Sequence, residues 1–403
     1  MRFYEYESKK ILAKYGIPFP KGGVAKTAEE AKNLAADLGG KVVVKAMVLT
    51  SSLTDRGTVR EANGPDEAAK ATEELLALKV GALTPVSVLV EEQVEVEREL
   101  ALQVTYDGVA KLPVMIASDV PRKNLDDVAD DTPDRVKRRH FSTLHPMRAQ
   151  TFRCKELVRS LGLGGSDLNR MTQVVSKLAD AMLEYDLTVA EINALGQTKD
   201  GKFIALDVNM DMEEEGRFRQ GALLEEFGIP MTETRGVRGE PTPMEREAQA
   251  IDADDPRGLI SPFVEFDGNM GLVIGAGGGS LTIFDAVTRH GGKPANYAAI
   301  GGNPSVKKAQ RLAKLVLSKE GVDKIAVMSN VVSNTRADLV ARGVIKGVLE
   351  LGLEPKEVIT IFRCPGAWEA DAFKILEKYG VDYCDRSVSL SEAAKRAVAK
   401  VQG

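Results

Sequence analysis

The sequence predicts an α/β protein whose second half is a doubly wound parallel sheet. The chain has 403 residues, which is too long for one hydrophobic core and predicts more than one domain. From residue 271 onward, short apolar strands alternate with helices, a pattern typical of parallel βα repeats. A stretch rich in proline and charge at 238–258 indicates a connection. We therefore expect domains at 1–240 and 261–403, joined by a linker at 241–260.

The first forty residues predict a helix, a strand and a second helix. Residues 5–15 have amphipathic spacing, and Gly16-Ile17-Pro18 ends that helix. Thr27 and Glu30 have the spacing of a capping box, which marks the start of the second helix.

A buried strand is predicted at Val42–Ala46, and Lys45 interrupts its valines. A buried ammonium without a partner is costly, so Lys45 needs an anion. The alternative is a lysine on an edge strand that reaches solvent. Further strands are expected at 87–94 and 98–104 as neighbours, with Glu91 and Glu99 near their ends.

The most informative segments are Ala190–Leu195 and Ile204–Asp207, which place Asn193 and Asp207 at the ends of two neighbouring apolar strands. Mg²⁺ prefers oxygen ligands and takes only one or two protein carboxylates together with substrate phosphates. The pair is therefore a candidate Mg²⁺ site, although asparagine in a turn and aspartate after a strand are also ordinary features. The charged residues at 123–139 are interpreted as a solvated loop and helix face, and 167–185 as a helix.

In the second half, strands are expected at residues 272–274, 297–300, 324–328, 358–362 and 381–383. Ligands of such sheets lie beyond the carboxyl ends of the strands. Three loops there, at 275–280, 301–305 and 329–335, offer free backbone N–H groups to an anion. The third precedes a helix at about 336–350, whose N-terminus carries roughly half a positive charge. The 275–280 loop lacks the later acidic residue of a dinucleotide-binding fingerprint, which argues against NAD.

Two further residues are candidates near this edge of the sheet. Arg363, at the end of the fourth strand, is expected either to clamp a substrate carboxylate bidentately or to be a surface arginine. Trp368, the only tryptophan, either lines the same pocket or covers the core, and we favour the core.

Composition excludes several classes of function. The net charge of −5 arises from nearly balanced signs, without the basic stripe that binds nucleic acid. No apolar run approaches the roughly 20 residues that cross a bilayer, and the start lacks a signal-peptide pattern, so we expect a cytoplasmic protein that binds no membrane. The three cysteines and three histidines have neither disulfide nor zinc spacing, and the cysteines are expected to be reduced thiols.

The chain resembles the β-type subunits of ADP-forming acyl-CoA synthetases, which include succinyl-CoA synthetase and the related malate-CoA and citrate-CoA ligases. The resemblance runs nearly end to end. Its most specific matches are Tyr4-Glu5-Tyr6-Glu7, Val90-Glu91 and its spacing to Glu99, Glu191-Ile192-Asn193, Leu206-Asp207, Phe218-Arg219-Gln220, Asp267-Gly268-Asn269-Met270-Gly271 and His290-Gly291-Gly292-Lys293-Pro294-Ala295-Asn296.

The resemblance implies an N-terminal ATP-grasp fold of two α+β lobes and a C-terminal flavodoxin-like domain. It implies that Mg²⁺ and ATP or GTP bind between the lobes, with Asn193 and Asp207 as metal ligands. The nucleotide-binding residues would be Lys45, Ser52, Glu91, Val94 and Glu99.

The resemblance also implies that Asn269 and the turn Ser333-Asn334-Thr335 meet a small carboxylic acid. The acid is expected to be a di- or tricarboxylate such as succinate, malate or citrate. Phosphate would pass from ATP to a histidine and then to the acid, and CoA would attack the acyl phosphate. The histidine and most of the CoA site belong to an α-type partner subunit, and we find no candidate nucleophile in this chain.

The chain departs from the family in two places. The family's glycine-rich loop after the lysine is Thr50-Ser51-Ser52-Leu53-Thr54-Asp55-Arg56-Gly57 here, with one glycine, which hinders close approach of the backbone to a triphosphate. Ser333-Asn334 replaces two glycines, so succinate is not secure as the acid. Two alternative hypotheses therefore stay open, an ATP-grasp carboxylate–amine ligase that needs no CoA and a non-catalytic regulatory subunit.

Overall fold

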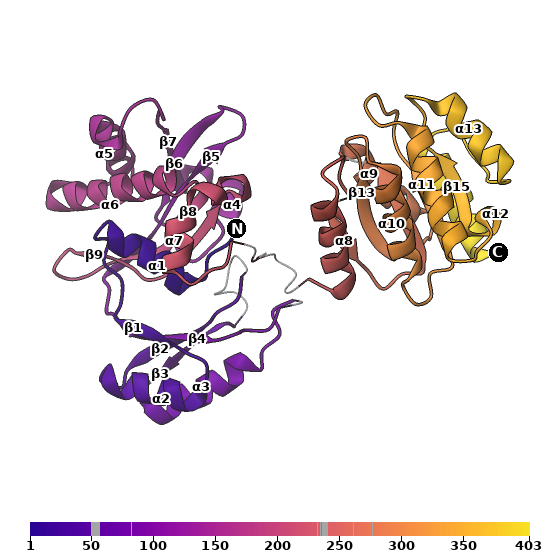
Figure 1. Ribbon diagram of the computed structural model, residues 1–403. Coiled ribbons are helices and arrows are strands. Elements are labelled where there is room, and N and C mark those ends of the chain that lie inside the picture. Colours follow the sequence, from indigo (N-terminus) through magenta and orange to yellow (C-terminus); the bar gives the residue numbers. More distant parts are fainter. Residues whose placement is uncertain are drawn as a thin grey trace. The chain divides into compact units, whose positions relative to one another are not determined.

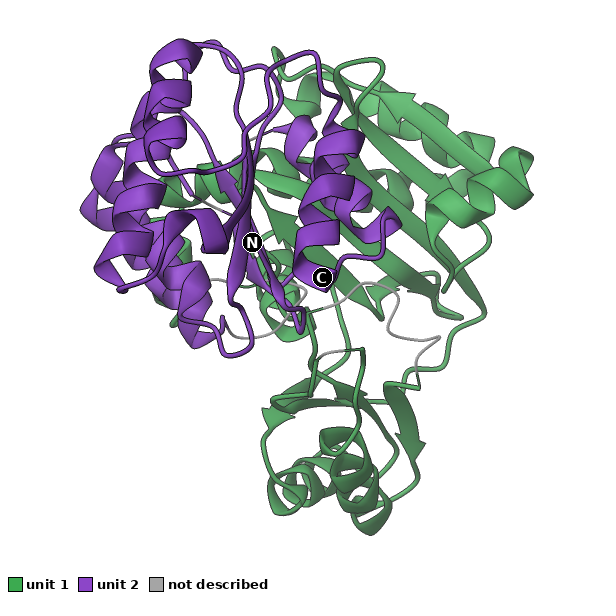
Figure 2. Cartoon of the chain, turned by 90° about the vertical axis from the view of Figure 1, so that its right-hand side faces the viewer, with its two compact units in different colours: residues 1–240 green, residues 241–403 purple. Residues whose placement is uncertain are grey.

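A computed structural model describes residues 1–49, 57–81, 83–231, 233, 235, 241–260, 262–275 and 277–403. The chain divides into two compact units, residues 1–240 and 241–403, which Figure 2 distinguishes by colour. The first unit contains two separate antiparallel sheets, and the second contains one mostly parallel sheet.

The smaller sheet of unit 1 has four strands in the order β1-β4-β2-β3, all antiparallel. Two helices, α2 and α3, cover one of its faces (Figure 1). Alanines and valines at alternate positions of the strands meet small residues of these helices in a compact core. The elements are β1 (Gly22–Ala25), α2 (Ala28–Asp37), β2 (Val42–Ala46), β3 (Val59–Ala62), α3 (Pro65–Leu76) and β4 (Val88–Glu92).

The larger sheet of unit 1 has the order β10-β8-β5-β6-β7, and β9 pairs with β8. Its strands are β5 (Arg98–Asp107), β6 (Leu112–Ser118), β7 (Val136–His140), β8 (Leu187–Gln197), β9 (Phe203–Ala205) and β10 (Val208–Met212). The helices of this lobe are α1 (Glu5–Lys14), α4 (Leu125–Asp131), α5 (Thr151–Ser160), α6 (Gly165–Glu184) and α7 (Gly221–Glu226), with short 3-10 turns at Pro133–Arg135, Met147–Ala149 and Glu214–Arg219.

Local sequence explains how several of these elements begin and end. Helix α1 ends before Gly16, whose φ of 63° is unfavourable for residues with a side chain. The Thr27 hydroxyl caps α2 by accepting from Glu30 N at 3.2 Å, but the Glu30 carboxylate accepts from Lys26 N, so only half of the capping box forms. Thr242 and Glu245 form a complete capping box at α8 (Pro243–Asp254), with Pro243 in the first turn.

The sheet of unit 2 has the order β11-β13-β12-β14-β15. Strands β12, β13, β14 and β15 are parallel, and β11 is an antiparallel edge. One core joins the sheet to α8, α10, α11 and α13, and another joins its opposite face to α9 and α14. The remaining bounds are β11 (Phe263–Glu265), β12 (Met270–Gly275), α9 (Gly278–Arg289), β13 (Asn296–Ile300), α10 (Val306–Leu317), β14 (Lys324–Met328), α11 (Ala337–Glu350), α12 (Pro355–Val358), β15 (Ile359–Arg363), α13 (Glu369–Lys378) and α14 (Leu390–Gln402).

The α/β class, the two lobes of unit 1 and the doubly wound sheet of unit 2 are confirmed, but four details differ from the sequence prediction. Strands β4 and β5 lie in different sheets and are not neighbours. Residues 381–383 form a single parallel bridge, Phe362 to Tyr383, rather than a fifth strand. The expected linker 241–260 contains α8, which packs in the core of unit 2. The charged stretch 123–139 contains the expected helix, α4, but ends in the edge strand β7, which was not expected.

The close packing of α10 on α11 generates a stability prediction. A Cβ at Gly343 would lie 2.6 Å from Ala309 Cβ and 2.6 Å from Val306 O, whereas a Cβ at Gly278 would meet no atom within 4 Å. We expect Gly343→Ala to lower the free energy of unfolding by about 1–3 kcal/mol through overpacking. Gly278→Ala is the matched control, and this variant should have the same free energy of unfolding as the unaltered chain or a slightly higher one. Urea unfolding followed by Trp368 fluorescence measures both, and equal stabilities of the two variants would contradict the packing.

Candidate functional site

A buried cluster of two lysines and two glutamates connects the two lobes of unit 1. Glu5 and Lys9 lie on α1, which packs on the larger sheet, whereas Lys45 lies on β2 and Glu91 on β4. Lys9 Nζ lies 2.7 Å from Glu5 Oε1 and 2.6 Å from Glu91 Oε1, and Lys45 Nζ lies 2.6 Å from Glu5 Oε1 and 3.1 Å from Glu91 Oε2. We call these four residues the Lys–Glu cluster.

The cluster confirms that Lys45 has anionic partners and shows that the edge-strand alternative is wrong, because β2 is an interior strand. Burial acts to lower the pKa of Lys45, but the charges of Glu5 and Glu91 outweigh burial and raise the pKa above its usual value. The Lys45 ammonium therefore stays charged. Burial likewise acts to raise the pKa of Glu5, and the charges of Lys45 and Lys9 hold it below its usual value. Lys45 and Glu5 are therefore both ionised in the folded protein.

The Lys–Glu cluster also positions the main chain beside Asp207. Both Lys9 Nζ, at 3.1 Å, and Lys45 Nζ, at 2.5 Å, donate to the carbonyl oxygen of Leu206. Residues 206 and 207 lie between β9 and β10, where the ladder along β8 is interrupted. The two lysines thereby fix the chain at the residue that precedes the expected metal ligand.

Asn193 and Asp207 are neighbours, as the sequence predicts. The main-chain N–H of Asn193 donates to Asp207 O at 3.0 Å, and Leu206 N donates to Ala194 O at 2.9 Å. Asn193 does not lie at a strand end as expected, because β8 continues to Gln197. It lies instead in the middle of β8, opposite the break between β9 and β10.

The side chain of Asn193 is held from three directions. Its Oδ1 accepts from Arg122 N at 2.6 Å, and its Nδ2 donates to Lys123 O at 2.8 Å and to Glu191 Oε1 at 3.1 Å. Burial raises the pKa of Glu191. These contacts fix the orientation of the amide oxygen, which keeps a second lone pair for a cation.

Burial raises the pKa of Asp207 to about 7, and the charge of nearby Glu5 adds to that effect. One carboxylate oxygen of Glu5, Oε2, is buried and has no hydrogen-bond partner in the described part of the chain. Excess negative charge and an oxygen without a partner beside Asp207 suit a hard divalent cation. The residues therefore fit Mg²⁺.

The described residues contain no group of three or more histidine, cysteine, aspartate or glutamate side chains that could hold a metal ion.

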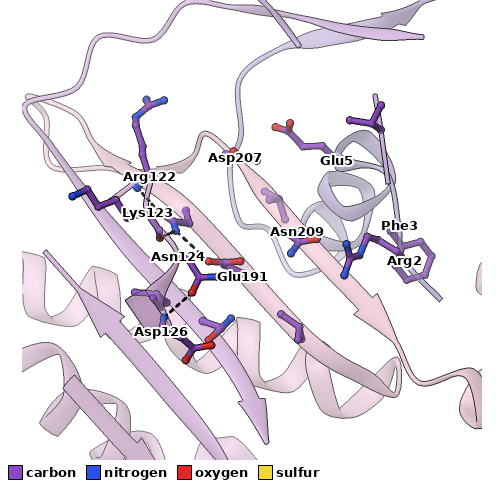
Figure 3. A pocket seen from close by; sticks show the side chains of 16 residues that line it. Arg2, Phe3, Glu5, Arg122, Lys123, Asn124, Asp126, Glu191, Asp207 and Asn209 are labelled. Atoms are coloured by element: carbon purple, nitrogen blue, oxygen red, sulfur yellow. Dashed lines mark hydrogen bonds between the residues drawn. The ribbon is translucent and has the colours of Figure 1, made fainter. Parts of the chain in front are cut away.

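Two cavities meet at Asp207. The first cavity has a volume of about 220 Å³, and its lining includes Glu5, Glu191, Asn193 and Asn209. In the view of Figure 3, Asp207 lies between Glu5 and the Arg122–Asn124 segment. The other, of about 210 Å³, is lined by Pro20, Val43, Lys45, Val59, Glu61, Glu91, Glu92, Gln93, Val94, Glu99, Arg122, Leu206 and Asp207. All the described nucleotide-binding residues of the prediction thus line one cavity, and Ser52 lies outside the described residues.

The site contains residues that the sequence analysis did not select, namely Glu5, Lys9, Arg122 and Glu191. The i,i+4 spacing of Glu5 and Lys9 was a usable signal, since both face one side of the first helix. Arg122 carried no comparable signal in the sequence. It adjoins the charged stretch 123–139, which was interpreted as a solvated surface.

In unit 2 the carboxyl ends of the parallel strands bring the predicted loops together. A cavity of about 10 Å³, room for about one water molecule, is lined by Gly275, Ile300, Ser329, Thr335 and their neighbours. Buried Thr335 accepts from Asn303 N at 3.3 Å, and Arg336 N donates to Asn303 Oδ1 at 3.3 Å. Ser333 and Asn334 are exposed.

Asn269 does not join this group of loops. It precedes β12, at the amino end of the sheet, whereas Ser333–Thr335 follow β14 at the carboxyl end. Asn269 lines a separate cavity with Gly291, Gly292 and Lys293. The expectation that Asn269 and Ser333–Thr335 meet one substrate is therefore wrong for this fold, because parallel strands place the two positions at opposite edges.

Arg363 and Trp368 also differ from expectation. Arg363 is buried, and its Nε and Nη1 donate to the carbonyl oxygens of Val388 at 2.7 Å and Ser329 at 2.5 Å. Each forked edge of a guanidinium includes one of these two atoms, so neither edge is free for a bidentate carboxylate. Trp368 is 55% exposed rather than in the core, and the Arg336 guanidinium lies 4.1 Å from its ring centroid.

Comparisons with known proteins agree with this geometry. Residues 2–197 match the model of the ATP-grasp domain. The chain is 35% identical over 405 residues to the β subunit of the GDP-forming succinate–CoA ligase of Thermus thermophilus, and 31% identical over 405 residues to that of the ADP-forming enzyme of Roseiflexus sp. strain RS-1, with each pair covered in full. The structure of ATP citrate lyase from Methanothrix soehngenii in complex with citrate and coenzyme A matches 99% of both chains with a TM-score of 0.74 and 16% identity, which shows a shared fold.

The two lobes, the cavities between their sheets and the adjacent Asn193 and Asp207 define an ATP-grasp protein that binds a nucleotide. Identity along the whole chain then specifies the family. This chain belongs to the β subunits of the ADP- or GDP-forming succinate–CoA ligases, which are acid–thiol ligases. No described helix is long and apolar enough to cross a membrane.

Burying a charged Asp207 is unfavourable for folding, so we predict that a neutral residue at this position stabilises the fold but weakens binding. With a folded pKa near 7 and a lower unfolded value, the carboxyl destabilises the fold increasingly as the pH rises, with the full cost above about pH 7. Asp207→Asn should therefore raise the free energy of unfolding without nucleotide by about 1–2 kcal/mol at pH 8 and by less at pH 5. It should also weaken binding of Mg²⁺-nucleotide. Denaturant unfolding at both pH values and calorimetry measure these effects; a loss of stability at pH 8 would contradict the electrostatic account.

Proposed function

We propose that this chain is the nucleotide-binding subunit of a carboxylate–CoA ligase that converts ATP or GTP to the diphosphate and phosphate as it joins an acid to CoA. The observation that supports it best is the position of Asp207, which lines one cavity with Asn193 and a second cavity with Lys45, Glu91 and Glu99. Such a site can hold a divalent cation against the phosphates of a nucleotide, because it offers two oxygen ligands and leaves the remaining positions to water and phosphate.

Each part of unit 1 has a role in this proposal. Asn193 and Asp207 would hold Mg²⁺, and the bound ion would offset negative charge on the phosphates. Lys45 stays paired in the Lys–Glu cluster and adds positive charge beside the phosphates, and Glu91, Val94 and Glu99 line the part of the cavity that takes the nucleoside. Ser52 belongs to the same set by resemblance. The relatives include both ADP- and GDP-forming enzymes, so the choice of base is left to experiment.

The acid substrate and the partner are also part of the proposal. We infer an α-type subunit that supplies the phosphorylated histidine and most of the CoA site, and a di- or tricarboxylate that meets Ser333, Asn334 and Thr335 at the start of α11. Exposed Ser333 and Asn334 offer hydrogen bonds beside the positive end of a helix dipole. A cytoplasmic location and the absence of nucleic-acid and membrane partners stay predictions.

Reconstitution tests the proposal. The chain should co-purify with an α-type partner and then form a thioester from CoA and one member of a panel containing succinate, malate and citrate, with ATP or GTP and Mg²⁺. Asp207→Ala should lower turnover by at least about 100-fold, because one oxygen ligand of the cation is lost.

The same assay separates the alternatives. Product formed with an amine and without CoA would support a carboxylate–amine ligase, whereas a thioester formed only when CoA is present would support the CoA ligase. A partner whose activity is unchanged by Asp207→Ala would indicate a regulatory subunit. Absence of nucleotide binding and of activity with every partner would contradict the proposal.

A further inference from the structure

Arg122 lies where the two cavities that Asp207 lines meet. Among the residues that the structure describes, Arg122 and Asp207 are the two that line both cavities. Arg122 belongs to the loop between β6 and α4, and in Figure 3 its side chain extends on the same side of the pocket as Lys123. A group in this place faces both the expected metal site and the expected nucleoside site.

The main chain of Arg122 is fixed to the expected metal ligand. Its N–H donates to Asn193 Oδ1 at 2.6 Å, and Asn193 Nδ2 donates to the carbonyl oxygen of the next residue, Lys123, at 2.8 Å. Arg122 has a φ of 61°, a conformation that is unfavourable for a residue with a side chain and that surrounding contacts must hold. The Cα position is therefore set by Asn193, independently of the guanidinium.

The guanidinium itself is paired but accessible. Its Nε and Nη2 each lie 2.6 Å from an oxygen of Glu99, and the two side chains are 46% and 20% exposed. Such a half-exposed pair adds little net stability because water solvates both partners well. Another anion can therefore replace the Glu99 carboxylate as the partner of the Arg122 guanidinium at little cost. Phosphate is suitable because it accepts the same pair of parallel hydrogen bonds as a carboxylate.

The charge around the cavities leaves a need for such a cation. Lys9 and Lys45 are buried and shared between Glu5 and Glu91, and Arg2 pairs with Asp211 at 3.3 Å. The other described cations that line the cavities are Arg122 and Lys123, against the carboxylates of Asp126, Glu191, Asp207, Glu61, Glu92 and Glu99. A polyphosphate that enters this acidic site needs hydrogen-bond donors with positive charge. The Arg122 guanidinium offers two parallel N–H donors and is exposed to the cavity.

We propose that Arg122 is a phosphate-binding residue that leaves Glu99 when a nucleotide enters and forms forked hydrogen bonds to its polyphosphate. Glu99, which lines the cavity expected to take the nucleoside, is released by the same exchange. The inference rests on the proposed nucleotide-binding function and adds a residue and an order of contacts to it. No covalent bond changes, and the exchange is one anion for another on a single guanidinium.

Calorimetry on the full chain, with its α-type partner where the two co-purify, tests this exchange. The probes are Mg²⁺-ATP, Mg²⁺-tripolyphosphate and adenosine. Arg122→Gln should weaken binding of the two polyphosphates about tenfold or more, as expected for a lost charged hydrogen-bond pair, and should change adenosine binding less than about twofold. Arg135→Gln is the matched control, because it breaks a comparably exposed pair, with Asp119 at 2.6 Å, in the same β6–β7 connection but outside both cavities.

Glu99→Gln gives a second test with the opposite sign. If Glu99 competes with phosphate for Arg122, Glu99→Gln should tighten binding of Mg²⁺-tripolyphosphate, which has no nucleoside to lose. The double variant should then bind it as weakly as Arg122→Gln. If the Arg122–Glu99 pair were only a structural tether, both single variants would weaken binding alike.

Three outcomes would overturn the inference. Equal weakening by Arg122→Gln and Glu99→Gln would show a tether, unchanged tripolyphosphate binding in Arg122→Gln would show no phosphate contact, and an equal effect of Arg135→Gln would show a nonspecific charge effect. In each case the unaltered chain would still bind Mg²⁺-ATP, so the proposed function would stand. A failure of the unaltered chain to bind any nucleotide would overturn the proposed function together with this inference.

Discussion

The buried ion pairs of Glu5, Lys9, Lys45 and Glu91 are the interaction on which the site depends. They join α1, which packs on the larger sheet, to β2 and β4 of the smaller sheet. Burying four charges is expensive unless each is paired and hydrogen-bonded, and here the cost is met by short contacts and by the Leu206 carbonyl oxygen, which accepts from both lysines. Removing any one member would leave an uncompensated buried charge. The cluster therefore holds the two lobes of unit 1 to each other and also fixes the main chain next to Asp207.

This constraint explains why the site can hold a carboxylate whose pKa lies near 7. Asp207 follows the carbonyl group that the lysines fix, and β8 holds it from the other side through Asn193 and Ala194. Its charge is unfavourable there in the absence of a cation, because burial and Glu5 both oppose ionisation. The free energy stored in that charge becomes available when a divalent cation binds. Local destabilisation at a functional residue of this kind is held in place by the rigid sheet around it.

Much of the fold and part of the site could be predicted from the sequence. Hydrophobic periodicity located α1, β2, α6, α11 and the parallel strands, because each buries one regular face. Asn193 and Asp207 were also correctly predicted to lie close together, since a short connection joins the adjacent strands β8 and β9. Contacts between distant segments were not predictable in the same way. Nothing local to Glu91 and Glu99 reveals that β4 and β5 belong to different sheets, and Asn269 lies at the opposite sheet edge from Ser333 because strand direction, not sequence spacing, decides the edge. Arg122 and Trp368 depend on loop conformations with positive φ, for which arginine and tryptophan carry no signal.

The most direct test of this account is a crystal structure of the chain with Mg²⁺ and a non-hydrolysable nucleoside triphosphate analogue. The account predicts a metal ion about 2.0–2.1 Å from Asn193 Oδ1 and from a carboxylate oxygen of Asp207, with phosphate oxygens and water completing an octahedron. The Lys–Glu cluster should keep its pairs while the nucleotide occupies the cavity lined by Lys45 and Glu99. A metal ion bound without Asp207, or a nucleotide bound outside the cavities that meet at this residue, would contradict it.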